Sequence, residues 1–266
     1  MKNRTAATPF ALWMILFTVI PMLIVFYFAF TDEAGRFTLG NIMHIGDYAG
    51  TYIDSIWMGA LATVICLVLA YPVALSISRH AEHMQRTMVL IVMLPMWMNF
   101  LLRTYAWISI LSDNGLLNAL LEKIGIGPLK LMYTDFAVMI GQICDFLPFM
   151  IIPIHTSLSK MDKSYVEAAY DLGANPFQTF FRVVFKLSIP GVLNGIIMVF
   201  LLSISTFVIP KLLGGGQFVL MGNLIENQFV SVGDWNFGSA ISIVLAAIIL
   251  LAIKWMKKID TGENQS

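Results

Sequence analysis

Long apolar stretches alternate with short polar ones along this chain of 266 residues. Charge-free runs cover residues 5–31, 55–78, 87–102, 187–210 and 235–253, and a sixth run, 136–159, is broken only by Asp145. A helix needs roughly 20 residues to cross the hydrocarbon of a bilayer. The third run reaches that length if it continues past Arg103 to Leu111. We therefore expect an all-α membrane protein with six transmembrane helices, at about 10–30, 55–78, 87–111, 136–156, 188–210 and 235–254.

The composition agrees with this prediction. The chain is 58% hydrophobic and 12% charged, whereas soluble domains average about 25% charged residues. A formal net charge of +0 argues against nucleic-acid binding. Cys66 and Cys144 lie inside apolar runs, which favours buried free thiols over a disulfide. We expect residues 1–266 to form one transmembrane domain surrounded by membrane lipid.

The basic residues predict the orientation. With the N-terminus inside, eleven of the sixteen Lys and Arg residues fall in the cytoplasmic segments. This bias favours a multi-pass protein of the plasma or inner membrane with both termini in the cytoplasm. It also places the polar loop 160–187, between the fourth and fifth helices, on the cytoplasmic side.

That loop carries consistent helix signals. Ser164 and Glu167 have the spacing of a capping box, Gly173 suits the left-handed residue that ends a helix, and Asn175 before Pro176 predicts a second helix start. The first helix has small residues where another protein's backbone can approach. The alternative is a solvated amphipathic helix that contacts no other protein.

The spacing of Glu167, Ala168, Ala169 and Gly173 is similar to the Glu-Ala-Ala-x-x-x-Gly loop of the membrane subunits of ATP-binding-cassette (ABC) importers. The match then loosens, because the proline that usually follows comes here only at Pro190. The resemblance implies the type I importer permease fold. It also implies that this loop is a coupling helix that docks on a separate ATPase subunit.

Further stretches resemble the first permease subunit of spermidine/putrescine importers; they are residues 101–107, 147–150, 160–163, 213–216, 222–229 and 234–238. This resemblance implies a heterodimer with a second permease subunit. It further implies two copies of a cytoplasmic ATP-binding subunit and an extracytoplasmic substrate-binding protein.

Asp145 is the residue that is energetically most costly to place in a membrane helix, since an ionised carboxylate at mid-membrane costs around 3 kcal/mol. Gln142, three residues earlier, shares its helix face. We expect Asp145 to face the translocation path and attract a cation. The alternative is that it pairs with a neighbouring helix or is protonated.

The third predicted helix carries four further candidates for the substrate path: Trp97, Arg103, Tyr105 and Trp107. The aromatic rings can bind ammonium groups by cation–π attraction or form an interfacial belt. An unpaired Arg103 would repel a polycation and favour an anion, and it can instead snorkel or pair with Asp113. A polyamine substrate and an anionic or zwitterionic solute therefore both remain open.

The sequence indicates a non-catalytic subunit. It contains no Gly-x-x-x-x-Gly-Lys-Ser/Thr phosphate loop, no plausible nucleophile–base pair and no histidine cluster for a metal. We expect no cofactor on this chain, with ATP and Mg²⁺ bound by the partner ATPase. The alternatives outside this class are an ion-coupled secondary transporter that uses Asp145, and a membrane scaffold or receptor.

Overall fold

The computed structural model describes residues 8–216 and 218–263, with side chains of the last helix described as far as Lys254. Five helical segments are long and apolar enough to cross a membrane, and a bent helix pair supplies a sixth. This confirms the predicted all-α membrane fold. The basic residues Lys2 and Arg4, used above for orientation, lie outside the described residues, as do the side chains of Lys257 and Lys258.

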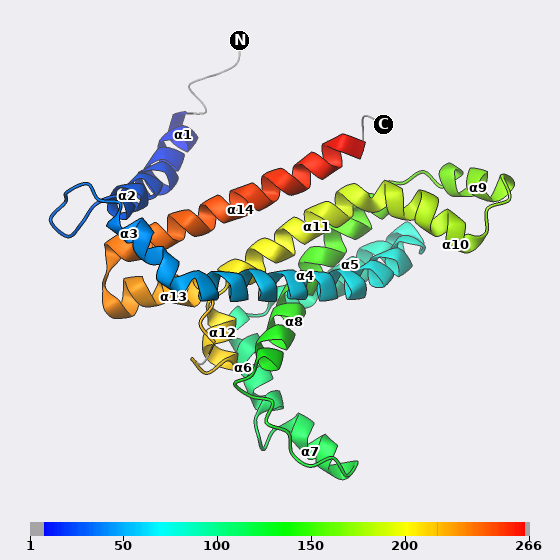
Figure 1. Ribbon diagram of the computed structural model, residues 1–266. Helices are drawn as coiled ribbons and strands as arrows, with labels where there is room; N and C mark the ends of the chain where they lie inside the picture. The colour runs from blue at the N-terminus through cyan, green and yellow to red at the C-terminus, as the bar shows by residue number, and fades with distance from the viewer. Residues whose placement is uncertain (1–7, 217, 264–266) are drawn as a thin grey trace.

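The spans are assembled from shorter helices in chain order (Figure 1). The first comprises α1 (Thr8–Met14), the π-helical turn η2 (Ile15–Val19) and α2 (Ile20–Ala29); the second comprises α3 (Gly40–Met43), η3 (His44–Tyr48) and α4 (Ala49–Ser78). The fourth is α8 (Asp135–Ser159), the fifth runs through α10 (Pro176–Thr179), η4 (Phe180–Val184) and α11 (Phe185–Ser205), and the last is α14 (Trp235–Glu263).

The main core lies where α4, α8 and α11 pack together. Glycines allow the close approach of α11 to α8. A Cβ atom added at Gly191 would lie 2.6 Å from the Pro153 carbonyl oxygen, and one added at Gly195 would lie 2.6 Å from the Met150 sulfur. Small residues at such contacts are the usual means by which membrane helices approach each other, because lipid supplies no hydrophobic force between them.

The third span differs from the prediction. In place of one helix at 87–111, α5 (Glu82–Trp97) is followed by α6 (Phe100–Leu111), and the segment Phe100–Lys123 that α6 begins meets α5 at 84°. Pro95 lies in the last turn of α5, Met98 is extended, and the Asn99 side chain accepts the Leu101 amide at 2.9 Å to begin α6. A proline followed by an N-cap asparagine therefore ends one helix and starts another.

The fifth span also ends earlier than 210. Helix α11 stops at Ser205 because Thr206 is extended, and a separate short helix, α12 (Val208–Leu213), carries Pro210. Between α12 and α14 lie α13 (Met221–Asn227) and the π-helical turn η5 (Gln228–Val232).

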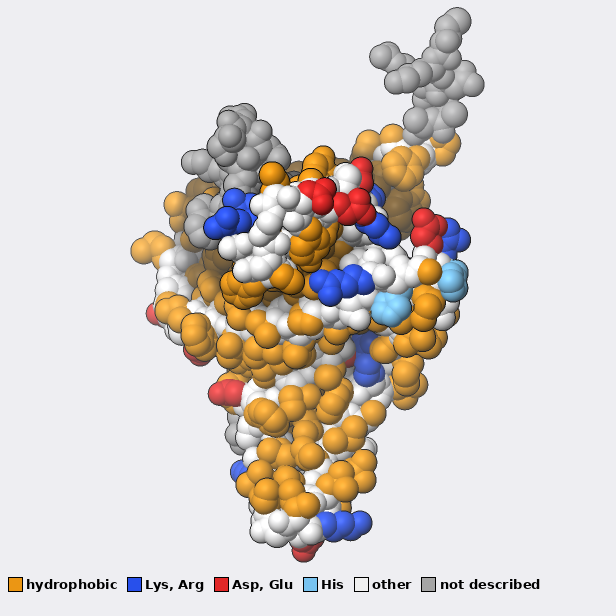
Figure 2. Space-filling view, turned by 90° about the vertical axis from the view of Figure 1, so that its right-hand side faces the viewer, with side chains coloured by type: hydrophobic (Ala, Val, Ile, Leu, Met, Phe, Trp, Pro, Cys, Tyr) orange, Lys and Arg blue, Asp and Glu red, His pale blue; other side chains and the backbone are white. Residues whose placement is uncertain are grey.

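Polar segments gather at the two ends of the bundle. Helices α9 (Ser164–Asp171) and α10 lie beyond one end of the long helices, whereas α3 and α13 lie at the other, and α6 and α7 (Leu116–Lys123) extend to one side (Figure 1). Figure 2 looks at the end that carries α9 and α10, where Lys, Arg, His and acidic side chains gather over a largely apolar body.

Candidate functional site

The start of α9 is capped differently from the prediction. The Asp162 carboxylate, not the Ser164 hydroxyl, caps this helix, because it accepts the Ser164 amide at 3.0 Å. Ser164 is the first residue of α9 and not its N-cap, and the Glu167 amide donates to the Lys163 carbonyl at 3.1 Å, so the predicted Ser164–Glu167 capping box is wrong. The bonds from the backbone and side chain of Ser164 hold the pKa of Asp162 below its usual value, since they favour the charged carboxylate.

The end of α9 is as predicted. Gly173 has a φ of +81°, its amide donates to the Tyr170 carbonyl at 2.8 Å, and the Ala174 amide donates to the Ala169 carbonyl at 3.0 Å. These two bonds define a Schellman motif. The next helix begins with the predicted Asn175 cap, which accepts the Gln178 amide at 2.8 Å.

The residues proposed for coupling lie on the surface of this short, well-capped helix. None of the α9 residues is buried, and Glu167, Ala168 and Gly173 are exposed. Large apolar side chains beside them are exposed too, with Leu172 at 89% and Phe177 at 72%. Exposed apolar side chains gathered around a polar helix are typical of a protein-binding surface.

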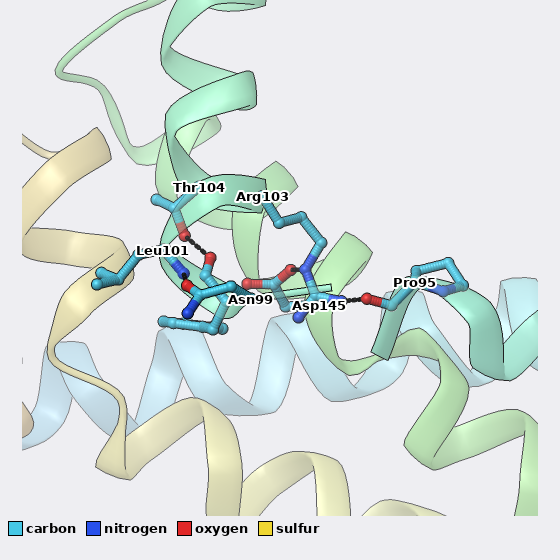
Figure 3. A network of polar contacts seen from close by, with 7 residues as sticks. Pro95, Asn99, Leu101, Arg103, Thr104 and Asp145 are labelled. Carbon is cyan, nitrogen blue, oxygen red and sulfur yellow. Dashed lines mark hydrogen bonds and ion pairs between the residues drawn. The ribbon is translucent and has the colours of Figure 1, made fainter. Parts of the chain in front are cut away.

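A second polar site lies near the middle of α8, where α6 meets it (Figure 3). The guanidinium Nε of Arg103 pairs with Asp145 Oδ1, and the two side chains are 15% and 2% exposed. The Nη1 atom of Arg103 also donates to the Pro95 carbonyl at 2.7 Å. The Phe100 ring centroid lies 5.9 Å from the guanidinium carbon. Of the alternatives above, the structure shows Asp145 paired with a neighbouring helix and Arg103 paired with Asp145, not Asp113.

Arg103 and Asp145 form part of the wall of a cavity of about 320 Å³. The remaining wall is mostly apolar and consists of Met96, Phe100, Phe146, Phe149, Leu202, Ser205 and Thr206. Ser205 and Thr206 belong to the C-terminal end of α11, which carries partial negative charge from the helix dipole. A carboxylate, aromatic rings and a helix C-terminus therefore meet at one cavity.

The other path candidates do not line this cavity. Gln142 is fully buried; its Nε2 donates to the Ser203 carbonyl at 3.4 Å, and its Oε1 has no partner among the described residues. Trp97 is 71% and Tyr105 is 53% exposed, and Trp107 packs against the edge of the main core. The structure therefore brings Arg103 and Asp145 together and leaves the three aromatic residues outside.

Sequence reasoning missed Gln85, which joins three helices near the loop. Its Nε2 donates to the carbonyls of Ser78 and His80 at 3.1 and 2.8 Å, and its Oε1 accepts the Ser159 hydroxyl at 3.0 Å. It lies on the wall of a cavity of about 1020 Å³ that also includes Glu167. No local pattern distinguishes Gln85 from an ordinary polar residue in a first helical turn.

A polytopic helical bundle, a largely buried charged pair inside it and an exposed helical loop are features typical of a membrane transport protein. Residues 1–261 match the family of binding-protein-dependent transport system inner membrane components, and the chain belongs to this family. It is thus a multi-pass inner-membrane protein.

The curated relatives are permeases. The chain is 37% identical to the spermidine/putrescine transport system permease protein PotB of Haemophilus influenzae, covering 91% of this chain and 88% of that protein. It is 36% identical to PotB of Escherichia coli, with 91% and 93% covered. The inner membrane ABC transporter permease protein YdcU of Escherichia coli is 30% identical, with 84% and 76% covered.

Solved structures support the fold. A bacterial ABC transporter involved in import of the acidic polysaccharide alginate aligns with a TM-score of 0.77 at 16% identity, covering 96% of this chain and 93% of that one. A bacterial alginate ABC transporter in complex with an alginate pentasaccharide-bound periplasmic protein aligns with a TM-score of 0.80 at 14% identity, covering 95% and 91%. The fold is therefore that of an ABC importer permease.

Proposed function

We propose that this chain is the non-catalytic permease subunit of an ATP-driven polyamine importer. The observation that carries the proposal is the 36–37% identity to spermidine/putrescine permeases over 91% of the chain. The Arg103–Asp145 pair supports it, because an Arg103 neutralised by a carboxylate no longer favours an anionic substrate. Spermidine or putrescine is therefore the proposed cargo, in preference to an anionic or zwitterionic solute.

The proposed complex contains a second permease subunit, two copies of a cytoplasmic ATP-binding subunit and an extracytoplasmic substrate-binding protein. ATP and Mg²⁺ bind the ATPase, and both termini of this chain lie in the cytoplasm. The α9 surface with Glu167, Ala168, Ala169 and Gly173 docks on the ATPase. Its exposure and the capping at both of its ends support this role, since a rigid helix can transmit a displacement to the bundle.

Asp145 and Arg103 are the proposed substrate-path residues, because they meet at a cavity between α6, α8 and the end of α11. An intramembrane charge that faces a cavity and not lipid is typical of transport paths. Four other residues are weaker candidates for the substrate path because none of them lines that cavity; they are Gln142, Trp97, Tyr105 and Trp107.

Reconstitution of the whole complex tests the proposal. Proteoliposomes that contain this chain, its partner permease and the ATPase are supplied with the binding protein, ATP and labelled putrescine. We expect ATP-dependent accumulation that unlabelled spermidine inhibits and glutamate or sulfate does not. Accumulation that follows an imposed proton or sodium gradient without ATP would instead support a secondary transporter, and uptake of anions would reject the polyamine assignment.

A further inference from the structure

Three features of the cavity beside Arg103 and Asp145 favour a positive charge. The carboxylate of Asp145 lies in its wall, and the face of an aromatic ring such as Phe100 attracts cations by its quadrupole. The third feature is the C-terminal end of α11 at Ser205 and Thr206. Helix C-termini at interrupted spans are a known means of holding cations inside transporters.

This cation site is already filled by the chain itself. The guanidinium of Arg103 pairs with Asp145 and lies 5.9 Å from the Phe100 ring centroid, so it uses two of the three features. The apolar part of the wall, which includes Phe146, Phe149 and Leu202, carries no charged group that could pair with a ligand. It suits instead the methylene groups of an alkylammonium ion.

The same guanidinium also holds the bend of the third span. Its Nη1 bonds the Pro95 carbonyl, which is also the acceptor of the Met98 amide at 3.2 Å where α5 ends. Figure 3 shows the Arg103 side chain reaching between Asp145 on α8 and Pro95 on α5. Because the side chain arises from α6, it connects both arms of the bend to α8.

We infer that Arg103 is an internal substitute for the ammonium group of the substrate, and that an entering alkylammonium displaces it from Asp145. The inference rests on the proposed polyamine function. Displacement separates the bend between α5 and α6 from α8, so that occupancy of the cavity changes how firmly the third span is held. With both cations present the site carries an excess positive charge, which keeps the substrate weakly bound and able to leave.

Opposite kinetic effects of the two partners test this exchange. In proteoliposomes with the complete complex, the Arg103→Gln variant removes the competitor, and the Asp145→Asn variant removes the shared anion. We expect the half-saturating putrescine concentration to fall about tenfold in the first and rise about tenfold in the second, the size of one charge-assisted contact. The maximal rate should fall in Arg103→Gln, because the bound substrate is no longer expelled.

The matched control is Lys211→Gln, which removes the cation of the Lys211–Glu226 pair outside this cavity. It should leave the half-saturating concentration unchanged. A purely structural Arg103–Asp145 pair predicts instead that both cavity variants lose activity in parallel without opposite shifts, and that result would overturn the inference.

The unmodified complex provides a second measurement if the variants assemble poorly. Phenylglyoxal labelling of Arg103, read by mass spectrometry, should rise several-fold when putrescine is present, because the guanidinium leaves its carboxylate. Unchanged or reduced labelling contradicts the exchange. If the unmodified complex imports polyamines but shows neither the opposite kinetic shifts nor the increased labelling, only the inference is rejected. If the complex shows no ATP-dependent polyamine uptake, both the proposed function and the inference are rejected.

Discussion

The loop of residues 160–187 and the Arg103–Asp145 cavity are two polar regions of the described part of the molecule, and they are built in opposite ways. The loop is held by bonds between near neighbours, such as Asp162 to Ser164 and Ala174 to Ala169. The cavity depends on Arg103 and Asp145, which come from different helices and are largely buried. Substitutions on the surface of the loop should therefore leave the fold intact. Substitutions of the charged residues at the cavity should change both transport and the stability of the fold.

The largest expected effect is on the cavity side of this comparison. Removing one partner of a buried ion pair leaves an uncompensated charge, so Arg103→Met should lower the free energy of unfolding by about 3–5 kcal/mol. The double variant with Asp145→Leu should recover most of that loss, because no unpaired charge remains. Thermal unfolding of the purified complex in detergent measures both.

The Lys211→Met variant is the control for that measurement. Lys211 is 55% exposed in its pair with Glu226, and exposed pairs contribute about 0–1 kcal/mol. Equal losses in Arg103→Met and Lys211→Met would remove the distinction between buried and exposed charge on which the comparison depends.

A smaller effect is expected where α11 packs on α8. A Cβ at Gly191 would lie 2.5 Å from the Ser157 Cβ and 2.6 Å from a backbone oxygen, so Gly191→Ala should destabilise the fold by about 1–3 kcal/mol through overpacking. Gly50→Ala in the first turn of α4, where a Cβ meets nothing within 4 Å, is the matched control. If Gly191→Ala leaves the free energy of unfolding unchanged, α8 and α11 are packed less tightly than the contacts of Gly191 indicate.

On the loop side, Glu167→Lys should change the unfolding free energy by less than about 0.5 kcal/mol, because Glu167 is an exposed surface residue. If α9 docks on the ATPase, the reversed charge should uncouple ATP hydrolysis from uptake. Hydrolysis and uptake are measured together in proteoliposomes. Glu122→Lys in α7, also exposed, is the control and should transport normally; full transport by Glu167→Lys would contradict docking at this residue.

The smallest effect concerns the start of α9. Asp162→Ala removes the acceptor of the Ser164 amide, so that amide should exchange faster with deuterium while the melting temperature stays the same. Since the pKa of Asp162 is lowered in the fold, the cap is fully formed above the pKa of the unfolded chain. It is lost as pH falls through the lower folded value. Slow exchange in the variant at neutral pH would show that another group caps the helix.

The sequence predicted several features that local rules control, although the capping box at Ser164 was wrong. Charge-free runs located the spans, and Gly173 and Asn175 correctly marked helix boundaries. Pro95 predicts a kink in the third span, but its break into two helices at Met98 was not predicted, because an apolar stretch alone does not distinguish a bent span from a broken one. The partner of Asp145 required the packing of α6 on α8, which no spacing rule supplies.

The first span has a consequence for biogenesis. From Thr8 to Ala29 it places only Ala29 in the interior, and its other side chains are at least partly exposed. The transfer of its own apolar side chains into lipid therefore supplies most of what holds it in the bilayer, and the later helix that packs against it is α14. During synthesis this apolar segment can enter the membrane before α14 is made, and α14 then packs beside a segment that is already in place.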